Sequence, residues 1–167
     1  IKDGDVLIGI ESSGPHSNGY SLIRKIIKDS SLSKEELNLI ADKALKPTLL
    51  YPNLILKLLD NFTINGVAHI TGGGLTENIP RSIPDKLCVD ILKDSWDVPE
   101  IFEWLKKNGN IKEEDMFRIF NCGIGMVLIV NYDIVENIMS YIREQNYKCF
   151  QIGLVKNKNS NDSVNYI

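Results

Sequence analysis

The sequence predicts an α+β fold in which α-helices cover a mixed β-sheet. Short runs rich in Val, Ile and Leu, each bounded by turn residues, recur along the chain and are typical of buried strands. Segments with helical apolar spacing lie between these runs. Strands and helices intermix without a regular β-α-β-α rhythm, which argues against a doubly wound parallel sheet. The sequence contains no Rossmann or Walker fingerprint.

The strands are predicted from short apolar runs. We expect them at residues 5–11, 67–71, 86–92, 126–130 and 147–155. Gly66, Gly123 and Gly125 are expected to open two of these strands. We expect the polar, Asn-rich residues 156–162 to form a turn between two edge strands.

The helices are expected at residues 20–28, 34–45, 53–62, 75–79, 99–107, 113–120 and 133–144. Ser33 and Glu36 form a capping-box pattern before the second helix, because each side chain can accept a hydrogen bond from the other residue's backbone N–H. Pro80 is expected to end the fourth helix. Pro99 is expected to occupy the first position of the fifth helix, where its missing N–H costs nothing.

Several large side chains are predicted to pack inside. The spacing of Leu54, Leu58 and Leu59 is expected to turn all three toward the core. Trp96 and Trp104 flank a proline, and their simplest role is packing in a core or an interface.

Composition and charge narrow the function classes. A chain of 167 residues can form one domain that hides ~70% of its unfolded surface. The apolar fraction of 43% and the charged fraction of 25% are ordinary for a soluble globular protein. The net charge of −3, without a basic cluster, argues against a nucleic-acid partner. Because the longest apolar run covers only residues 126–130, we expect no membrane partner.

The cysteines favour a reducing compartment. Cys88, Cys122 and Cys149 are odd in number and widely spaced, so they predict neither a disulfide framework nor a zinc site. We therefore expect a cytoplasmic protein with no metal ligands in these residues. The chain begins with Ile1 and enters a predicted strand at once, so we expect it to be a piece of a longer protein.

Residues 12–21, SSGPHSNGYS, join the first predicted strand to the first predicted helix. A helix N-terminus offers unpaired N–H groups and a partial positive charge to an anion. The glycines would let the backbone approach a ligand, Ser12 and the other polar side chains could bind phosphate oxygens, and His16 could exchange a proton near neutral pH. The alternative is a tight loop whose Ser and Asn side chains only cap the helix.

Residues 71–78, TGGGLTEN, repeat the order of strand, glycines and helix start. Three consecutive glycines cost much backbone entropy on folding, which is typical of a place where the backbone comes close to something. The alternative is close packing of the helix on the sheet. Arg81 could form a forked contact with a phosphate. His69, just before this loop, is expected to be a buried, hydrogen-bonded structural histidine.

Residues 120–126, FNCGIGM, precede and enter the fourth predicted strand. Asn121 is a possible ligand contact. Cys122 has no adjacent base and no electropositive setting, which a nucleophilic thiol needs. We therefore interpret Cys122 as a small packing residue.

Five motifs in order along the chain resemble a known family: GDVLIGIESSGPHSNGYSLIRKI, LKPTLLYPN, HITGGGLTENIPR, a W-x-x-P-x-I-F-x-W-L run and FRIFNCGIGM. Together they resemble the C-terminal half of the aminoimidazole ribonucleotide synthetases, also called phosphoribosylformylglycinamidine cyclo-ligases. The resemblance runs from about residue 4 to the last strand.

The resemblance implies an ATP-dependent reaction of purine biosynthesis. ATP phosphorylates the formyl oxygen of formylglycinamidine ribonucleotide, and a nitrogen of the same molecule then closes the imidazole ring. Magnesium is required and potassium assists, and family members are homodimers. Residues 1–167 would be a single domain, the C-terminal half of a two-domain enzyme without the N-terminal half that supplies most ATP and metal contacts. We expect this half alone to fold but not to turn over.

Our hypothesis is that the loops of this domain form one wall of the active-site cleft. They would receive the ribose phosphate of the substrate or the developing anion. His16 is the candidate catalytic residue, and as an exposed loop side chain its replacement in the complete enzyme (His16→Ala) should lower turnover with little loss of stability. The candidate binding residues are Ser13, Gly14, Ser17, Asn18, Gly19, Gly72, Gly73, Gly74, Asn78, Arg81 and Asn121.

Two alternatives stay open. Another enzyme of the same ATP-dependent superfamily would share the two-half design, such as a formylglycinamidine ribonucleotide synthetase, a selenophosphate synthetase or a thiamine-monophosphate kinase. A non-catalytic phosphate-binding or dimerisation module would share only the fold. The intact SGPHSNGYS and TGGGLTENIPR strings favour the cyclo-ligase.

Overall fold

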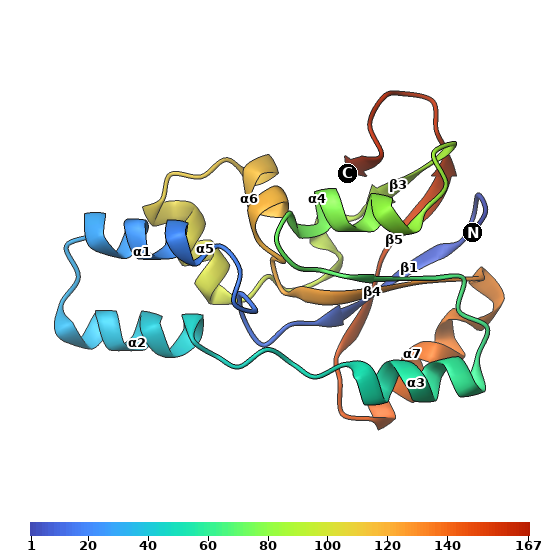
Figure 1. Ribbon diagram of the computed structural model, residues 1–167, viewed down its shortest axis with the longest axis horizontal. Helices are drawn as coiled ribbons and strands as arrows, with labels where there is room; N and C mark the ends of the chain where they lie inside the picture. Colours follow the sequence, from blue (N-terminus) through green and yellow to red (C-terminus); the bar gives the residue numbers. More distant parts are fainter.

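The chain forms a six-stranded sheet with helices on both faces (Figure 1). The computed structural model describes residues 1–167. Neighbouring strands are antiparallel except β3 and β6, which are parallel, so the predicted α+β fold with a mixed sheet is confirmed. In the order β2-β4-β1-β5-β3-β6, the strands are β1 (Val6–Glu11), β2 (Gly66–His69), β3 (Leu87–Ile91), β4 (Ile124–Val130), β5 (Cys149–Asn157) and β6 (Val164–Tyr166).

The helices agree with the predicted ones to within about two residues. The capping box of α2 is confirmed, because Ser33 Oγ accepts from the Glu36 N–H and the Glu36 carboxylate accepts from the Ser33 N–H. None of the helices has the length and apolar character needed to cross a lipid bilayer. The helices are α1 (Tyr20–Asp29), α2 (Lys34–Ala44), α3 (Pro52–Asn61), α4 (Gly74–Asn78), α5 (Glu100–Asn108), α6 (Glu113–Ile119) and α7 (Val135–Glu144), with 3₁₀ turns at Ile79–Ser82, Lys93–Ser95 and Tyr132–Ile134.

Alternation along β1 divides the core between the two faces of the sheet. Val6, Ile8 and Ile10 point to the face that α3 and α7 cover. Leu7 points to the other face and joins a larger cluster with residues of α1, α4, α5 and α6. Figure 1 shows α3 and α7 together below the sheet and α4 and α6 above it.

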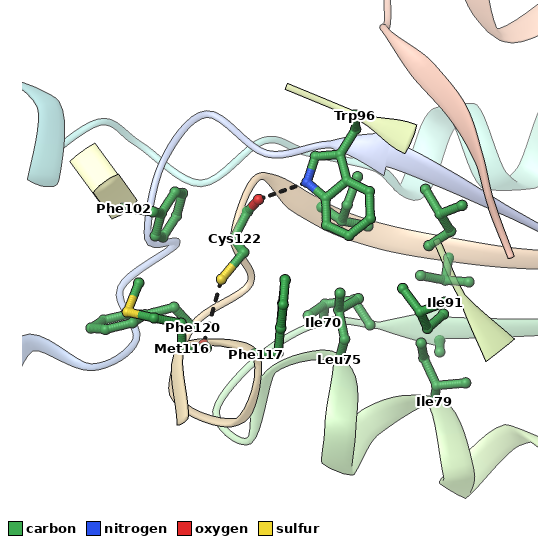
Figure 2. Packing of buried hydrophobic residues seen from close by; sticks show 14 of the residues in the cluster. Ile70, Leu75, Ile79, Ile91, Trp96, Phe102, Met116, Phe117, Phe120 and Cys122 are labelled. Atoms are coloured by element: carbon green, nitrogen blue, oxygen red, sulfur yellow. Dashed lines mark hydrogen bonds between the residues drawn. The ribbon is translucent and has the colours of Figure 1, made fainter. Parts of the chain in front are cut away.

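Trp96 lies in the larger cluster, part of which Figure 2 shows. Its indole Nε1 donates a hydrogen bond to the carbonyl of Cys122 at 2.9 Å, and the Phe117 ring meets it edge-on. Trp104 packs at the margin of the same cluster. The predicted packing role of both tryptophans is confirmed.

Some boundaries differ from the predicted ones. Leu54 and Leu58 are buried as expected, but Leu59 is 50% exposed because it lies a further 100° around α3. Pro99 is the residue before α5 rather than its first residue. Pro80 does not stop the chain from coiling, since a 3₁₀ turn continues through it. The strand β5 lies between β1 and β3 rather than at an edge.

Gly125 lies inside β4 rather than before it. The pairing of β1 with β4 skips this residue, which makes Gly125 the extra residue of a β-bulge. A Cβ at this position would collide with the Tyr51 hydroxyl and lie 2.8 Å from Cε1 of His16. The glycine is therefore required by a tertiary contact, which the local sequence pattern does not reveal.

The strand order brings three loops to one end of the sheet. β1 and β2 lie on opposite sides of β4 and both run antiparallel to it, so both end beside the start of β4. Glu11 pairs with Ile124, and His69 pairs with Met126. The loops after β1 and β2 and the loop before β4 therefore begin next to one another.

Candidate anion-binding site

The loop after β1 curls back on itself. His16, Ser17 and Gly19 have left-handed backbone conformations, with φ of 52°, 60° and 73°. The side-chain amide of Asn18 donates to the His16 carbonyl at 2.8 Å. The N–H groups of Ser17, Gly19 and Tyr20 have no acceptor within the protein. These three donors, at the start of α1, suit an anion.

His16 is buried, so the expectation of an exposed loop side chain is wrong. Only 4% of its surface is exposed. Its Nε2 accepts from the backbone N–H groups of Ser13 at 3.0 Å and Leu49 at 3.4 Å, which assigns the ring proton to Nδ1, a buried atom without a partner. Burial, and secondarily the nearby His69, lower the pKa of His16 to about 4, so its ring is neutral at pH 7.

Asn121 joins the first loop to the loop before β4. Its Oδ1 accepts hydrogen bonds from Ser12 Oγ and from the Gly123 N–H, each at 2.9 Å. Its Nδ2 donates to the Gly14 carbonyl at 2.8 Å, and the residue is 2% exposed. An amide can make four such bonds, so a single N–H is left for a ligand. The side chain mainly holds the two loops together.

Cys122 is the packing residue that the sequence predicts. It is 2% exposed, and its thiol lies 3.5 Å from the Met116 carbonyl, as Figure 2 shows. Burial raises the pKa of this thiol, which is the opposite of what activates a nucleophile.

Asn78 holds the glycine loop after β2 in shape. Its Nδ2 donates to the carbonyls of Gly72 at 3.1 Å and Gly74 at 2.8 Å. The Arg81 guanidinium donates to Oδ1 of Asn78 at 3.3 Å, which ties it to the same loop. Asn78 is buried, whereas Arg81 is exposed and keeps further donors for a ligand.

The fold itself requires two of the three glycines in this loop. Gly73 and Gly74 are left-handed, with φ of 96° and 57°. A Cβ on Gly73 would lie 2.6 Å from the Glu77 carboxylate, and one on Gly74 would lie 2.6 Å from the Phe120 carbonyl oxygen. Any side chain at either position would therefore strain the backbone and clash with protein atoms.

Gly72 differs from its two neighbours. Its φ is not left-handed, and a Cβ there would meet only Oδ1 of Asn18, at an ordinary 3.5 Å. The residue is exposed, and its N–H has no acceptor within the protein. The fold could therefore accommodate a side chain at position 72, although the residue there is glycine. The Asn18 contact also places the two glycine-bearing loops side by side, as their predicted common role requires.

His69 is exposed, and its side chain forms no hydrogen bond, so the expectation of a buried, hydrogen-bonded histidine is wrong. The Tyr51 ring lies near both histidines, with its centroid 6.0 Å from that of His16 and 6.1 Å from that of His69. The Tyr51 hydroxyl donates to the Glu11 carbonyl at 2.6 Å. His69 thus lies exposed two residues before the glycine loop, an arrangement that its sequence position indicates but its predicted burial does not.

The loops form an open wall. A cavity of about 630 Å³ lies between α6 and β6, and its lining includes none of the candidate binding residues. No three His, Cys, Asp or Glu side chains lie close enough together to hold a metal ion. The wall can therefore offer backbone donors, amide side chains and an imidazole to an anionic ligand, without metal ligands.

The mixed sheet, with helices on both faces and glycine-bearing loops at one end, defines an α+β domain that carries a candidate anion-binding site at its sheet end. The chain belongs to the family described as AIR synthase related protein, C-terminal domain, which matches residues 2–164. The resemblance predicted from the five motifs is thus confirmed.

Curated relatives agree with this assignment. The phosphoribosylformylglycinamidine cyclo-ligases of Neisseria gonorrhoeae (strain ATCC 700825 / FA 1090) and Neisseria meningitidis serogroup B (strain ATCC BAA-335 / MC58) are each 42% identical over 166 residues. The match covers 97% of this chain and 48% of each relative. The chain thus spans about half the length of these relatives.

Solved structures share the fold at low identity. An Escherichia coli HypE structure, of a hydrogenase maturation protein, has a TM-score of 0.65 and 16% identity, covering 99% of this chain and 47% of that chain. The thiamine-monophosphate kinase of Stenotrophomonas maltophilia K279a has a TM-score of 0.64 and 13% identity, covering 99% and 50%. These matches support the architecture alone.

Proposed function

We propose that this chain is the C-terminal domain of a phosphoribosylformylglycinamidine cyclo-ligase, the enzyme that makes aminoimidazole ribonucleotide in purine biosynthesis. The 42% identity to enzymes of that name supports the assignment. The structural neighbours of other function fit less well, since they are only 13–16% identical. The whole enzyme would be a cytoplasmic homodimer with this chain as one of two domains.

Within that enzyme, the loops after β1 and β2 would bind a negatively charged part of the substrate or nucleotide. The single observation that carries this proposal is Gly72, where the fold leaves space beside Asn18 and a free backbone N–H. Free donors at the start of α1 lie at the same end of the sheet, because α1 follows the loop after β1. Hydrogen bonds from backbone amides to a phosphate oxygen are charge-assisted and strong.

Of the cofactors that the family implies, this chain has groups that could bind ATP but none that could bind magnesium. ATP phosphates are anions that the free amides could help to bind. Magnesium has no suitable ligand cluster here, so the residues that bind it, and a supporting potassium ion, would belong to the other half of the enzyme. The role of this chain is therefore to bind and orient the substrate.

The test is ring closure by the full-length protein with formylglycinamidine ribonucleotide, ATP and magnesium, for the wild type and for Gly72→Ala. A methyl group at Gly72 would occupy the space beside the free N–H. Losing one charge-assisted contact should raise the KM for the substrate or for ATP by about 10- to 100-fold. The melting temperature should stay nearly unchanged, since the added Cβ meets only Asn18.

Gly4→Ala is the kinetic control, because Gly4 lies before β1, at the opposite end of that strand, with nothing within 4 Å of an added Cβ. Its left-handed φ of 87° strains an alanine, so this variant controls the KM values and not the melting temperature. It should leave both KM values unchanged. Unaltered kinetics in Gly72→Ala would contradict the proposed wall, and a wild type that closes no ring would contradict the assignment itself.

A further inference from the structure

The two histidines of the chain both lie near the Tyr51 ring but have opposite surroundings. His69 pairs with Met126, whose side chain belongs to the core under α3 and α7. The ring of Tyr51, in the same core, lies near both His69 and His16. His16 uses Nε2 to hold Ser13 and buries Nδ1. In contrast, His69 is exposed and neither of its ring nitrogens is used.

We propose that His69, and not His16, transfers a proton in the candidate site. The proposal rests on the proposed function. When a cyclo-ligase closes a ring, a substrate nitrogen forms a bond to carbon, and the bond from that carbon to a phosphorylated oxygen breaks, so that phosphate leaves. The nitrogen must lose one proton. An unprotonated ring nitrogen of His69 accepts this proton, and the imidazolium then releases it to water.

Three of the other titratable groups near the loops are poorly suited to this role. The Tyr51 hydroxyl is buried and donates to a backbone carbonyl, and burial raises its pKa. The Cys122 thiol is enclosed in the core. Arg81 stays charged at all relevant pH values. An imidazole ordinarily changes charge between pH 5 and 8, which suits proton transfer near neutrality.

The groups around His69 leave its ring accessible. Met126 on β4 is apolar, Tyr51 at the start of α3 is neutral, and His16 on the first loop is neutral at pH 7. Glu11 and Tyr147 also lie near Tyr51. His69 forms no ion pair with a carboxylate. His16 is then a positioning residue, which shapes the loop whose amides bind the anion.

The test uses the full-length protein and measures kcat and KM from pH 5 to 9 for His69→Gln. Glutamine keeps a hydrogen-bonding side chain but cannot titrate. We expect kcat to fall by about 10²- to 10⁴-fold, the usual contribution of a general base. The KM values should change by less than about threefold, and the loss of rate on the acidic side of the kcat profile should disappear. His69→Asn should behave in the same way.

Asp60→Asn is the control, since Asp60 is an exposed titratable residue on α3, outside the loops. It should leave kcat and its pH profile unchanged. A wild-type kcat in His69→Gln would overturn the role of His69 while leaving the proposed function intact. A raised KM at unchanged kcat and pH profile would show a binding role and would also overturn it. Failure of the wild-type enzyme to close the ring would overturn both.

Discussion

At the scale of single residues, the sequence indicates which loops are candidates for binding an anion, but it does not indicate the role of each side chain in them. Asn121 contacts Ser12 and Gly14, more than a hundred positions away along the chain, and these bonds use most of its amide. From the sequence, His16 is expected to be exposed but is buried, and His69 is expected to be buried but is exposed. In both cases the deciding contacts are long-range, and no local pattern contains them.

The buried His16 predicts a particular dependence of stability on pH. Its folded pKa of about 4 lies below the ordinary value of 6.5, so between these pH values the unfolded chain binds the proton more tightly. The stabilising contribution is therefore complete above pH 6.5 and is lost as the pH falls toward 4. Between pH 7 and pH 5 the loss should be about 1–2 kcal/mol.

Urea denaturation of the chain at pH 7 and pH 5 measures this loss. His16→Gln removes the titrating group and should lose less stability between the two pH values, although it is less stable at pH 7. An equal loss in the wild type and in His16→Gln would show that His16 does not titrate as described.

At the scale of elements, local patterns located nearly all helices and strands, because capping residues and apolar runs are local. The capping box of α2 is an example. Local patterns did not predict the conformation where a residue distant in the sequence determines it. Gly125 belongs to a bulge because the Tyr51 hydroxyl occupies the place of its side chain. Gly74 begins α4 where the backbone after α6 comes close.

The glycine loop therefore predicts opposite results for two similar changes. Gly74→Ala places a methyl group against the Phe117 and Phe120 carbonyl oxygens at a left-handed φ of 57°. It should lower the free energy of unfolding by about 2–4 kcal/mol, from overpacking and backbone strain together. Gly72→Ala should change it by less than about 0.5 kcal/mol.

Urea denaturation of both variants beside the wild type tests this contrast. Equal destabilisation by the two changes would mean that Gly72 is also required by the fold. The argument that its space belongs to a ligand would then fail.

At the scale of the whole molecule, the strand order matters most. The first and second glycine-bearing loops are more than fifty residues apart in the sequence. They meet because β1 and β2 flank β4 in the same direction. The sequence suggested that each loop binds an anion, but only the sheet pairing places them side by side. The open wall and the match to half of each relative suit a site that a second domain completes. Whether the chain alone folds without turning over stays a prediction.

A crystal structure of the full-length protein with formylglycinamidine ribonucleotide and a non-hydrolysable ATP analogue would show whether the two loops bind an anion. We expect an anionic oxygen within about 3 Å of the Gly72 N–H and of at least one free N–H at the start of α1. Both ligands bound in a closed site, with every phosphate and carboxylate oxygen distant from the two loops, would contradict it.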